Sequence, residues 1–273
     1  MIVLSYIPKP PLSDFVQLFW YYDGLTFPHE KERVMPDGSV EIVINLAEDR
    51  LYTYDPIDPN QSQTHTGCLL VGPRSECFVI DADAQTSVIG IHFKPGGAYP
   101  FLGCPSSETQ NHNLSLDLLW GPRAAEMRER VLQAITPLHR FQVLEAMLLS
   151  QVTQPLTQSP VITGGLFHIK QTNALLPISE LADRVGYSQR RFIQRFKEEV
   201  GMTPKRFSRI YRFQQAILSI EEMPQYPNWA QIALNCGYFD QAHFNHDFRA
   251  FSGLTPSQFA TQRGERRNHV PVG

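Results

Sequence analysis

The chain has 273 residues, of which 42% are hydrophobic and 19% are charged, and its formal net charge is −3. This composition can fill a hydrophobic core, which excludes disorder over most of the length. The length favours two domains, and no stretch approaches the ~20 apolar residues that a membrane-spanning helix needs.

The cysteines and the N-terminal residues indicate in which cellular compartment the protein is expected. The four cysteines, Cys68, Cys77, Cys104 and Cys236, fall at irregular spacing. Such spacing fits neither a disulfide framework nor a zinc-binding pattern. The N-terminus lacks the charged segment and the long apolar run of a secretory signal. We therefore expect a cytoplasmic protein with reduced thiols and no membrane association.

Charge is distributed unevenly along the chain. Residues 1–160 hold 10 Lys and Arg against 18 Asp and Glu, whereas residues 161–273 hold 14 against 9. An acidic half followed by a basic half is typical of a nucleic-acid-binding domain joined to a separate partner domain.

The first half of the chain is predicted to be rich in β-strands. Residues 15–22 are aromatic and apolar, and the Pro36-Asp37-Gly38 turn precedes an alternating apolar segment at 39–46. Further strands are expected at 50–54, 67–72, 76–81 and 86–94. About six short strands at this spacing favour an antiparallel barrel or sandwich.

Helical periodicity follows the strands. Residues 97–103 could form a short helix, and longer amphipathic helices are expected from Arg123 and from Pro137. These two helices would either cover the sheet or pair with a second subunit, and the sequence leaves both open. Residues 151–160 are rich in Gln, Thr and Pro and read as a linker. A weak helix is expected at 163–172 because two glycines destabilise it.

One sequence pattern occurs twice between residues 178 and 259. Matching residues of the two copies are 51 positions apart up to and including a Gly-Tyr pair, and 52 positions apart after it, because the second copy has one extra residue there. The first copy contains Ile178, Leu181, Ala182, Val185, Gly186, Tyr187, Phe192, Phe196, Gly201, Thr203, Pro204 and Phe207. The second contains Trp229, Ile232, Ala233, Cys236, Gly237, Tyr238, Phe244, Phe248, Gly253, Thr255, Pro256 and Phe259.

Each copy predicts a helix, a tight turn and a second helix, because its apolar positions fall three and four apart on either side of the Gly-Tyr pair. Ser188 and Asp240 stand at the expected N-caps of the two second helices. Residues 207–222 should form one long connecting helix. The polar, basic tail from Arg263 is expected to fray.

The complete prediction is an α+β chain of two domains. Residues 1–152 form an antiparallel β barrel or sandwich with trailing helices, which serves as an effector or dimerisation domain. Residues 153–160 are the linker. Residues 161–273 form an all-α domain with two helix-turn-helix units in tandem.

The repeat resembles the DNA-binding domain of AraC/XylS-type transcription regulators. Residues 186–204 resemble the first helix-turn-helix of that family and residues 237–256 the second, and the resemblance covers roughly 165–262. Within residues 1–150, Trp20, the Pro36-Asp37-Gly38 turn and residues 93–97 resemble an uncharacterised N-terminal domain found on some of these regulators. The resemblance implies double-stranded DNA as a partner, a contact with RNA polymerase, a small-molecule effector, no cofactor, and a monomer or homodimer. It leaves open whether the chain is an activator or a repressor.

The residues that face DNA follow from the buried Phe pairs, Phe192/Phe196 and Phe244/Phe248. Arg190 could bond guanine, Gln194 or Gln241 adenine, and Ile193 a thymine methyl group. Each residue alone could lie on a solvated helix face, but the duplicated motif favours DNA. The set is Ser188, Gln189, Arg190, Ile193, Gln194 and Lys197 in copy one, and Gln241, Ala242, His243, Asn245 and His246 in copy two. Arg195, Arg206, Arg209 and Arg212 are expected to make phosphate or structural contacts.

A candidate effector pocket in the first half contains Trp20, Tyr22, Glu41 and His92, which are aromatic or polar-tipped groups on predicted strands. The same residues could instead be core and surface positions. No spacing of His, Cys or acidic residues indicates a metal site or an enzyme. One alternative remains, a methyl-accepting DNA-repair protein fused to the same DNA-binding domain, which would need an activated cysteine.

Overall fold

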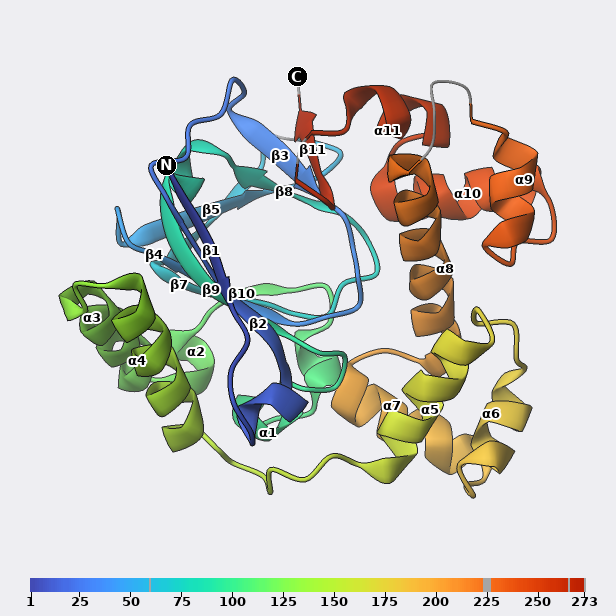
Figure 1. The fold of residues 1–273 in the computed structure, drawn as a ribbon, viewed down its shortest axis with the longest axis horizontal. Coiled ribbons are helices and arrows are strands. Elements are labelled where there is room, and N and C mark those ends of the chain that lie inside the picture. The colour runs from blue at the N-terminus through green and yellow to red at the C-terminus, as the bar shows by residue number, and fades with distance from the viewer. Residues whose placement is uncertain (59, 223–226, 265, 273) are drawn as a thin grey trace.

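The computed structural model describes residues 1–58, 60–222, 227–264 and 266–272. Two antiparallel sheets make up the N-terminal half, and helices make up most of the C-terminal half (Figure 1). The first sheet has the order β1 (Ile2–Tyr6), β2 (Val16–Asp23), β9 (Ser87–Phe93), β4 (Glu41–Asn45), β7 (Cys68–Val71), β10 (Asn113–Ser115). The second has the order β11 (His269–Val272), β3 (Lys31–Val34), β8 (Phe78–Asp81), β5 (Arg50–Tyr54), β6 (Ser62–Thr66).

The two sheets pack face to face as an open sandwich. All six segments expected to be strands are strands, and the alternation of side chains along β2 explains the layering. Phe19 and Tyr21 face one side of the first sheet, while Trp20 and Tyr22 face the second sheet. Neither sheet closes on itself, so the sandwich is correct and the barrel is not.

The described helices are α1 (Tyr99–Leu102), α2 (Asp117–Trp120), α3 (Pro122–Gln133), α4 (Pro137–Ser150), α5 (Pro160–Gln171), α6 (Ile178–Arg184), α7 (Gln189–Val200), α8 (Pro204–Glu221), α9 (Trp229–Asn235), α10 (Gln241–Ser252) and α11 (Pro256–Gln262). Among the described residues no helix is long and apolar enough to cross a membrane.

Helices α3 and α4 cover the outer face of the first sheet (Figure 1). Met127 and Val131 of α3 and Leu144 of α4 are fully buried in one core with Phe19 and Ile42 of the sheet. Of the two alternatives that the sequence left open, the structure therefore has these helices covering the sheet.

The tandem helix-turn-helix prediction is confirmed in its helices. In each copy a helix pair meets at a glycine, Gly186 or Gly237, whose φ of 73° or 79° lies in the left-handed region. Helix α8 runs between the two units, with Ile210, Phe213 and Ile217 fully buried. Helix α5 starts at Pro160, the last residue of the expected linker.

The prediction of a frayed C-terminal tail is wrong. Residues 269–272 form β11, which pairs antiparallel with β3 of the N-terminal half, and Val270 is buried. The chain thus returns from its last helix to the sheets where it began (Figure 1).

Further contacts hold the two halves together. The cluster of buried residues in the helical half includes Met35 and Cys77 from the N-terminal half. Hydrogen bonds also cross the boundary, among them those from Ser106 Oγ to Glu199 O at 2.8 Å, from Gln214 Nε2 to Pro36 O at 2.8 Å, and from Cys77 N to Phe251 O at 2.9 Å. The described residues of the helical half therefore pack directly on the sheets.

Candidate DNA-binding face and effector cavity

Helix α7 is amphipathic, and its caps fix where it starts and ends. The Ser188 hydroxyl accepts the Arg191 N–H at 3.4 Å, and Gly201 ends the helix in the left-handed conformation. Phe192 and Phe196 are fully buried and contact each other edge to face. The predicted register is therefore confirmed, and Ser188 serves as an N-cap.

The outward face of α7 carries the residues proposed to read DNA. Gln189, Arg190, Gln194 and Lys197 are exposed, and Ile193 is half-buried. Gln194 donates from Nε2 to Glu198 Oε1 at 3.1 Å, so its amide is held on the helix surface. Within the described part of the chain, Arg190 and Lys197 take part in no ion pair, which leaves both cations free for an anionic partner.

Helix α10 repeats this arrangement. Its N-cap Asp240 accepts the His243 N–H at 2.7 Å, and Phe244 and Phe248 are fully buried. Four of the predicted contact residues are exposed: Gln241, Ala242, Asn245 and His246. His243 differs because it is half-buried against the Tyr238 ring, with ring centroids 5.3 Å apart.

A buried carboxylate organises the inner side of α10. Asp247 is 2% exposed, and Arg209 of α8 binds both of its oxygens, at 2.7 and 3.1 Å. Nitrogens of His243 and His246 lie 3.7 and 3.6 Å from the same carboxylate. Burial raises the pKa of Asp247, but the hydrogen bond and charge of Arg209 outweigh burial and keep the pKa below its usual value.

The four arginines expected to make phosphate or structural contacts fall into two groups, those with a side-chain partner among the described residues and one without. Arg209 is bound to Asp247, Arg195 pairs with Glu198 and Glu199, and Arg212 lies over the Tyr238 ring. Arg206 is exposed at the start of α8. The first three make contacts within the chain, and the phosphate contact of Arg206 stays a prediction.

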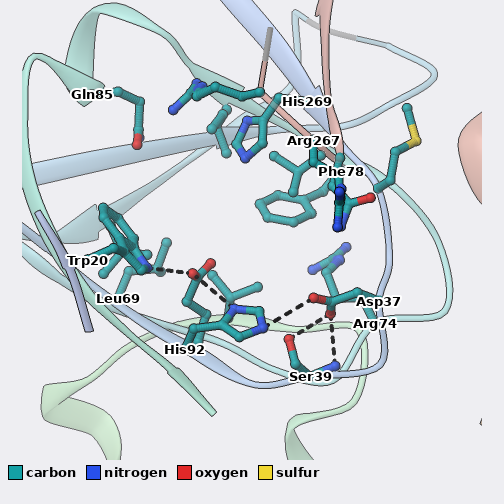
Figure 2. Close-up of a pocket in the computed structure, with 18 of the residues that line it drawn as sticks. Trp20, Asp37, Ser39, Leu69, Arg74, Phe78, Gln85, His92, Arg267 and His269 are labelled. Atoms are coloured by element: carbon teal, nitrogen blue, oxygen red, sulfur yellow. Dashed lines mark hydrogen bonds and ion pairs between the residues drawn. The ribbon is translucent and has the colours of Figure 1, made fainter. Parts of the chain in front are cut away.

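The four candidate pocket residues come together in one cavity of about 600 Å³ between the two sheets (Figure 2). Trp20 and Tyr22 lie on β2, Glu41 on β4 and His92 on β9, all on the inner face of the first sheet. Gly90 leaves room for the indole, since a Cβ there would come within 2.3 Å of the Trp20 ring.

Polar groups in the cavity form a chain. Trp20 Nε1 donates to Glu41 Oε1 at 2.7 Å, and His92 lies 3.4 Å from the same oxygen and 3.5 Å from Asp37 (Figure 2). Burial lowers the pKa of His92, but the hydrogen bond to Glu41 and the charges of Asp37 and Glu41 raise it to about 9. His92 is therefore an imidazolium at neutral pH.

The cavity is also bounded by the helical half, which the sequence did not indicate. Gln214 of α8 and residues 266–269 before and within β11 are part of its lining. Sequence reasoning missed them because they lie in the segment expected to fray or on a helix assigned to the other domain.

A buried acid anchors this returning segment. Glu32 is 3% exposed and bonds with Arg266, with His29 at 2.9 Å and with His269 at 3.0 Å. Burial raises the pKa of Glu32, but the hydrogen bond and charge of His269, with Arg266 and His29, lower it to about 2. The carboxylate thus stays ionised and ties the tail to the sheet.

The cysteines do not have the environment of a methyl acceptor. Cys68, Cys77 and Cys236 are buried and Cys104 is half-buried, and burial raises the pKa of all four thiols, that of Cys68 to about 12. A thiol that resists ionisation is a poor nucleophile. Within the described ranges, no group of three or more His, Cys, Asp or Glu residues is placed to hold a metal ion.

Comparison with known families divides the chain as the fold does. Residues 4–115 match a family described as a domain of unknown function (DUF6597), and residues 181–262 match one described as a helix-turn-helix domain.

Curated relatives match the second region. An uncharacterised HTH-type transcriptional regulator of Haemophilus influenzae is 35% identical over 82 residues, which are 30% of this chain and 27% of that protein. The HTH-type transcriptional regulator MtrA of Neisseria gonorrhoeae is 25% identical over 89 residues, 33% of this chain and 29% of that protein. The chain thus matches less than a third of the length of each relative.

Solved structures show weak likeness. An AraC-type regulator from Chromobacterium violaceum is 24% identical with a TM-score of 0.36, covering 39% of this chain and 94% of that chain. ToxT from Vibrio cholerae is 8% identical with a TM-score of 0.46, covering 89% and 95%. The chain thus has an N-terminal region similar to the DUF6597 family, followed by a C-terminal region similar to a family of helix-turn-helix domains.

Proposed function

We propose that the chain is a sequence-specific DNA-binding transcription regulator in which two helix-turn-helix units read adjacent major-groove segments. The observation that carries this proposal is the pair of exposed N-terminal halves on α7 and α10. Each lies opposite a buried Phe pair at matching positions of the repeat. Recognition helices present their N-terminal residues to base edges in this way.

The two helices would read different sequences. Helix α7 presents Arg190, a fork that can bond two acceptors of guanine, whereas α10 presents Gln241 and Asn245, whose amides suit adenine. His246 adds an exposed imidazole, whose ring N–H can donate a hydrogen bond. The site for one chain is therefore expected to be asymmetric.

We further propose that a small molecule in the cavity between the sheets controls this reading. The cavity volume falls within the range of ligand sites, and its lining mixes aromatic walls with a few polar groups. Gln214 belongs to the same helix α8 that connects the two units. A ligand that contacts Gln214 and the sheets at once would bias how the helical half sits on the N-terminal half.

Selection of bound duplexes from a random library with the full chain tests the proposal. The expected result is one asymmetric consensus with two conserved blocks centred about one helical turn apart. Binding to the selected duplex should weaken steeply with salt, and binding to a scrambled duplex should be weaker at every salt concentration. Recovery of no consensus, with equal affinity for selected and scrambled DNA, would contradict sequence-specific reading.

A further inference from the structure

One cation in the cavity lacks a matching anion. Arg74 follows β7, is 8% exposed, and lines the cavity with its side chain over the Phe78 ring, 4.3 Å from the centroid (Figure 2). Its guanidinium donates to Asn113 Oδ1 at 3.1 Å and to the Glu76 carbonyl at 3.4 Å. Both acceptors are neutral, and across the described residues Arg74 forms no ion pair with a carboxylate.

The other charged groups at the cavity each have an ion-pair partner. Glu41 and Asp37 share the His92 imidazolium, at 3.4 and 3.5 Å, so that end of the cavity carries one negative charge in excess. Arg267 pairs with Glu221 at 3.1 Å, and Arg266 pairs with Glu32. Among the described lining residues, the Arg74 guanidinium is thus the cation without an ion-pair partner, and the charge of Glu76 acts on it only from beyond ion-pair distance.

An unmatched buried cation costs free energy, because a guanidinium loses water that neutral acceptors replace only in part. Burial lowers the pKa of Arg74 to about 10 and outweighs the opposing charge of Glu76, which reflects the same cost. An anionic group that enters the cavity would recover it through a charge-assisted, two-pronged hydrogen bond.

Other side chains that line the cavity are apolar and indicate the chemistry of the rest of the ligand. Leu69 and Val71 of the first sheet and Phe78 and Ile80 of the second line the space between the sheets, and Trp20 lies at its edge. A planar or branched apolar skeleton can fill such a space, since aromatic and aliphatic surfaces gain most from leaving water.

We propose that the cavity binds an apolar molecule that carries one anionic group, a carboxylate or a phosphate ester, and that Arg74 holds this group. The inference rests on the proposed function of the cavity as the effector site and adds the ligand class. It also makes Arg74 the specificity-determining residue, while Glu41 and Asp37 exclude a second anion at the His92 end.

A matched series of probes on one ring system tests the proposal: naphthoate, naphthyl phosphate, naphthylmethanol and naphthylmethylamine. Binding is measured on the full chain without DNA, by quenching of tryptophan fluorescence and by the shift in melting temperature. At least one anion should bind about tenfold more tightly than the alcohol, as an added charge-assisted hydrogen bond implies. The stronger of the two anions identifies carboxylate or phosphate as the group held.

Substitutions of Arg74 test whether the preference for anions depends on this residue. Arg74→Met should remove the preference for anions, leave affinity for naphthylmethanol unchanged, and keep or raise the melting temperature of the free protein, because it deletes an uncompensated buried charge. Arg74→Lys should keep part of the preference, since it retains the charge without the fork. Arg50→Met removes an exposed cation of β5 outside the cavity and should change none of these values.

Three results would overturn the proposal: no anion binds at millimolar concentration, the alcohol binds as tightly as the anions, or Arg74→Met keeps the anion preference. DNA affinity is measured separately on the same preparations. Loss of anion binding with intact specific DNA binding refutes the ligand class alone. Anion binding that leaves DNA affinity unchanged refutes control through the cavity and leaves the ligand class standing.

Discussion

Arg190 is an exposed cation at the start of α7, free of any ion pair within the described part of the chain. We expect Arg190→Ala to cost about 1–3 kcal/mol of binding at the selected site and to relax preference at one base pair. Affinity for random duplex should fall much less. Fluorescence anisotropy on both duplexes measures the difference.

Arg184→Ala is the matched control for this variant. Arg184 is exposed on α6 and pairs with Glu180 at 2.7 Å, so its loss should affect both duplexes alike and only slightly. If Arg190→Ala loses the same affinity on specific and random DNA, Arg190 contacts phosphate and the assigned reading face is wrong.

Glu32 is expected to make the free energy of unfolding depend on pH in the acidic range. Its pKa in the folded state is about 2, below the ordinary value of 4.5, so its contribution is present above pH 4.5 and is lost as pH falls toward 2. The shift corresponds to about 3 kcal/mol. Urea unfolding at several pH values should therefore show wild type losing more stability over this range than Glu32→Gln, and parallel pH curves would refute the role of Glu32.

At the scale of elements, the two Phe pairs of α7 and α10, Phe192/Phe196 and Phe244/Phe248, share one core with α8. Phe196→Ala and Phe248→Ala should each destabilise the helical half by roughly 3–5 kcal/mol. Phe239→Ala removes an exposed ring from the turn before α10 and should stay within about 0.5 kcal/mol of wild type. Chemical denaturation compares the three, and wild-type stability of the first two variants would mean that the helical register is misread.

The contrast between α10 and β11 explains what the sequence could predict. The Phe pairs repeat at helical spacing, so α7 and α10 follow from local information. Strand β11 is only four residues long, His-Val-Pro-Val, and its proline argues against a strand. Its partner β3 lies near the other end of the chain. Its formation depends on a distant edge and on Glu32, which no local pattern reveals.

The cavity was predictable in part for the same reason. Trp20, Tyr22, Glu41 and His92 lie on predicted strands, and alternation places them on one face. Arg74 follows a strand in a loop, and Gln214 is brought in by the packing of α8. Loop conformation and the docking of the two halves are tertiary properties, so these residues appear only in the fold.

At the scale of the whole molecule, the placing of the two units follows from α8 and from the sheets. Helix α8 has an unbroken apolar face, and the ends of α7 and α10 both contact the N-terminal half, through Glu199 and Phe251. The two recognition helices should therefore act as one rigid reader that contacts successive major grooves on one face of DNA, about 34 Å apart.

Footprinting the full chain on its selected site, with and without an insertion of about five base pairs between the two conserved blocks, tests this claim most directly. Half a turn moves one block to the opposite face of the duplex, so a rigid reader should protect two adjacent turns on the original site and lose specific binding on the extended one. Equal protection of both blocks after the insertion would mean that the two units bind independently, and it would contradict the rigid arrangement.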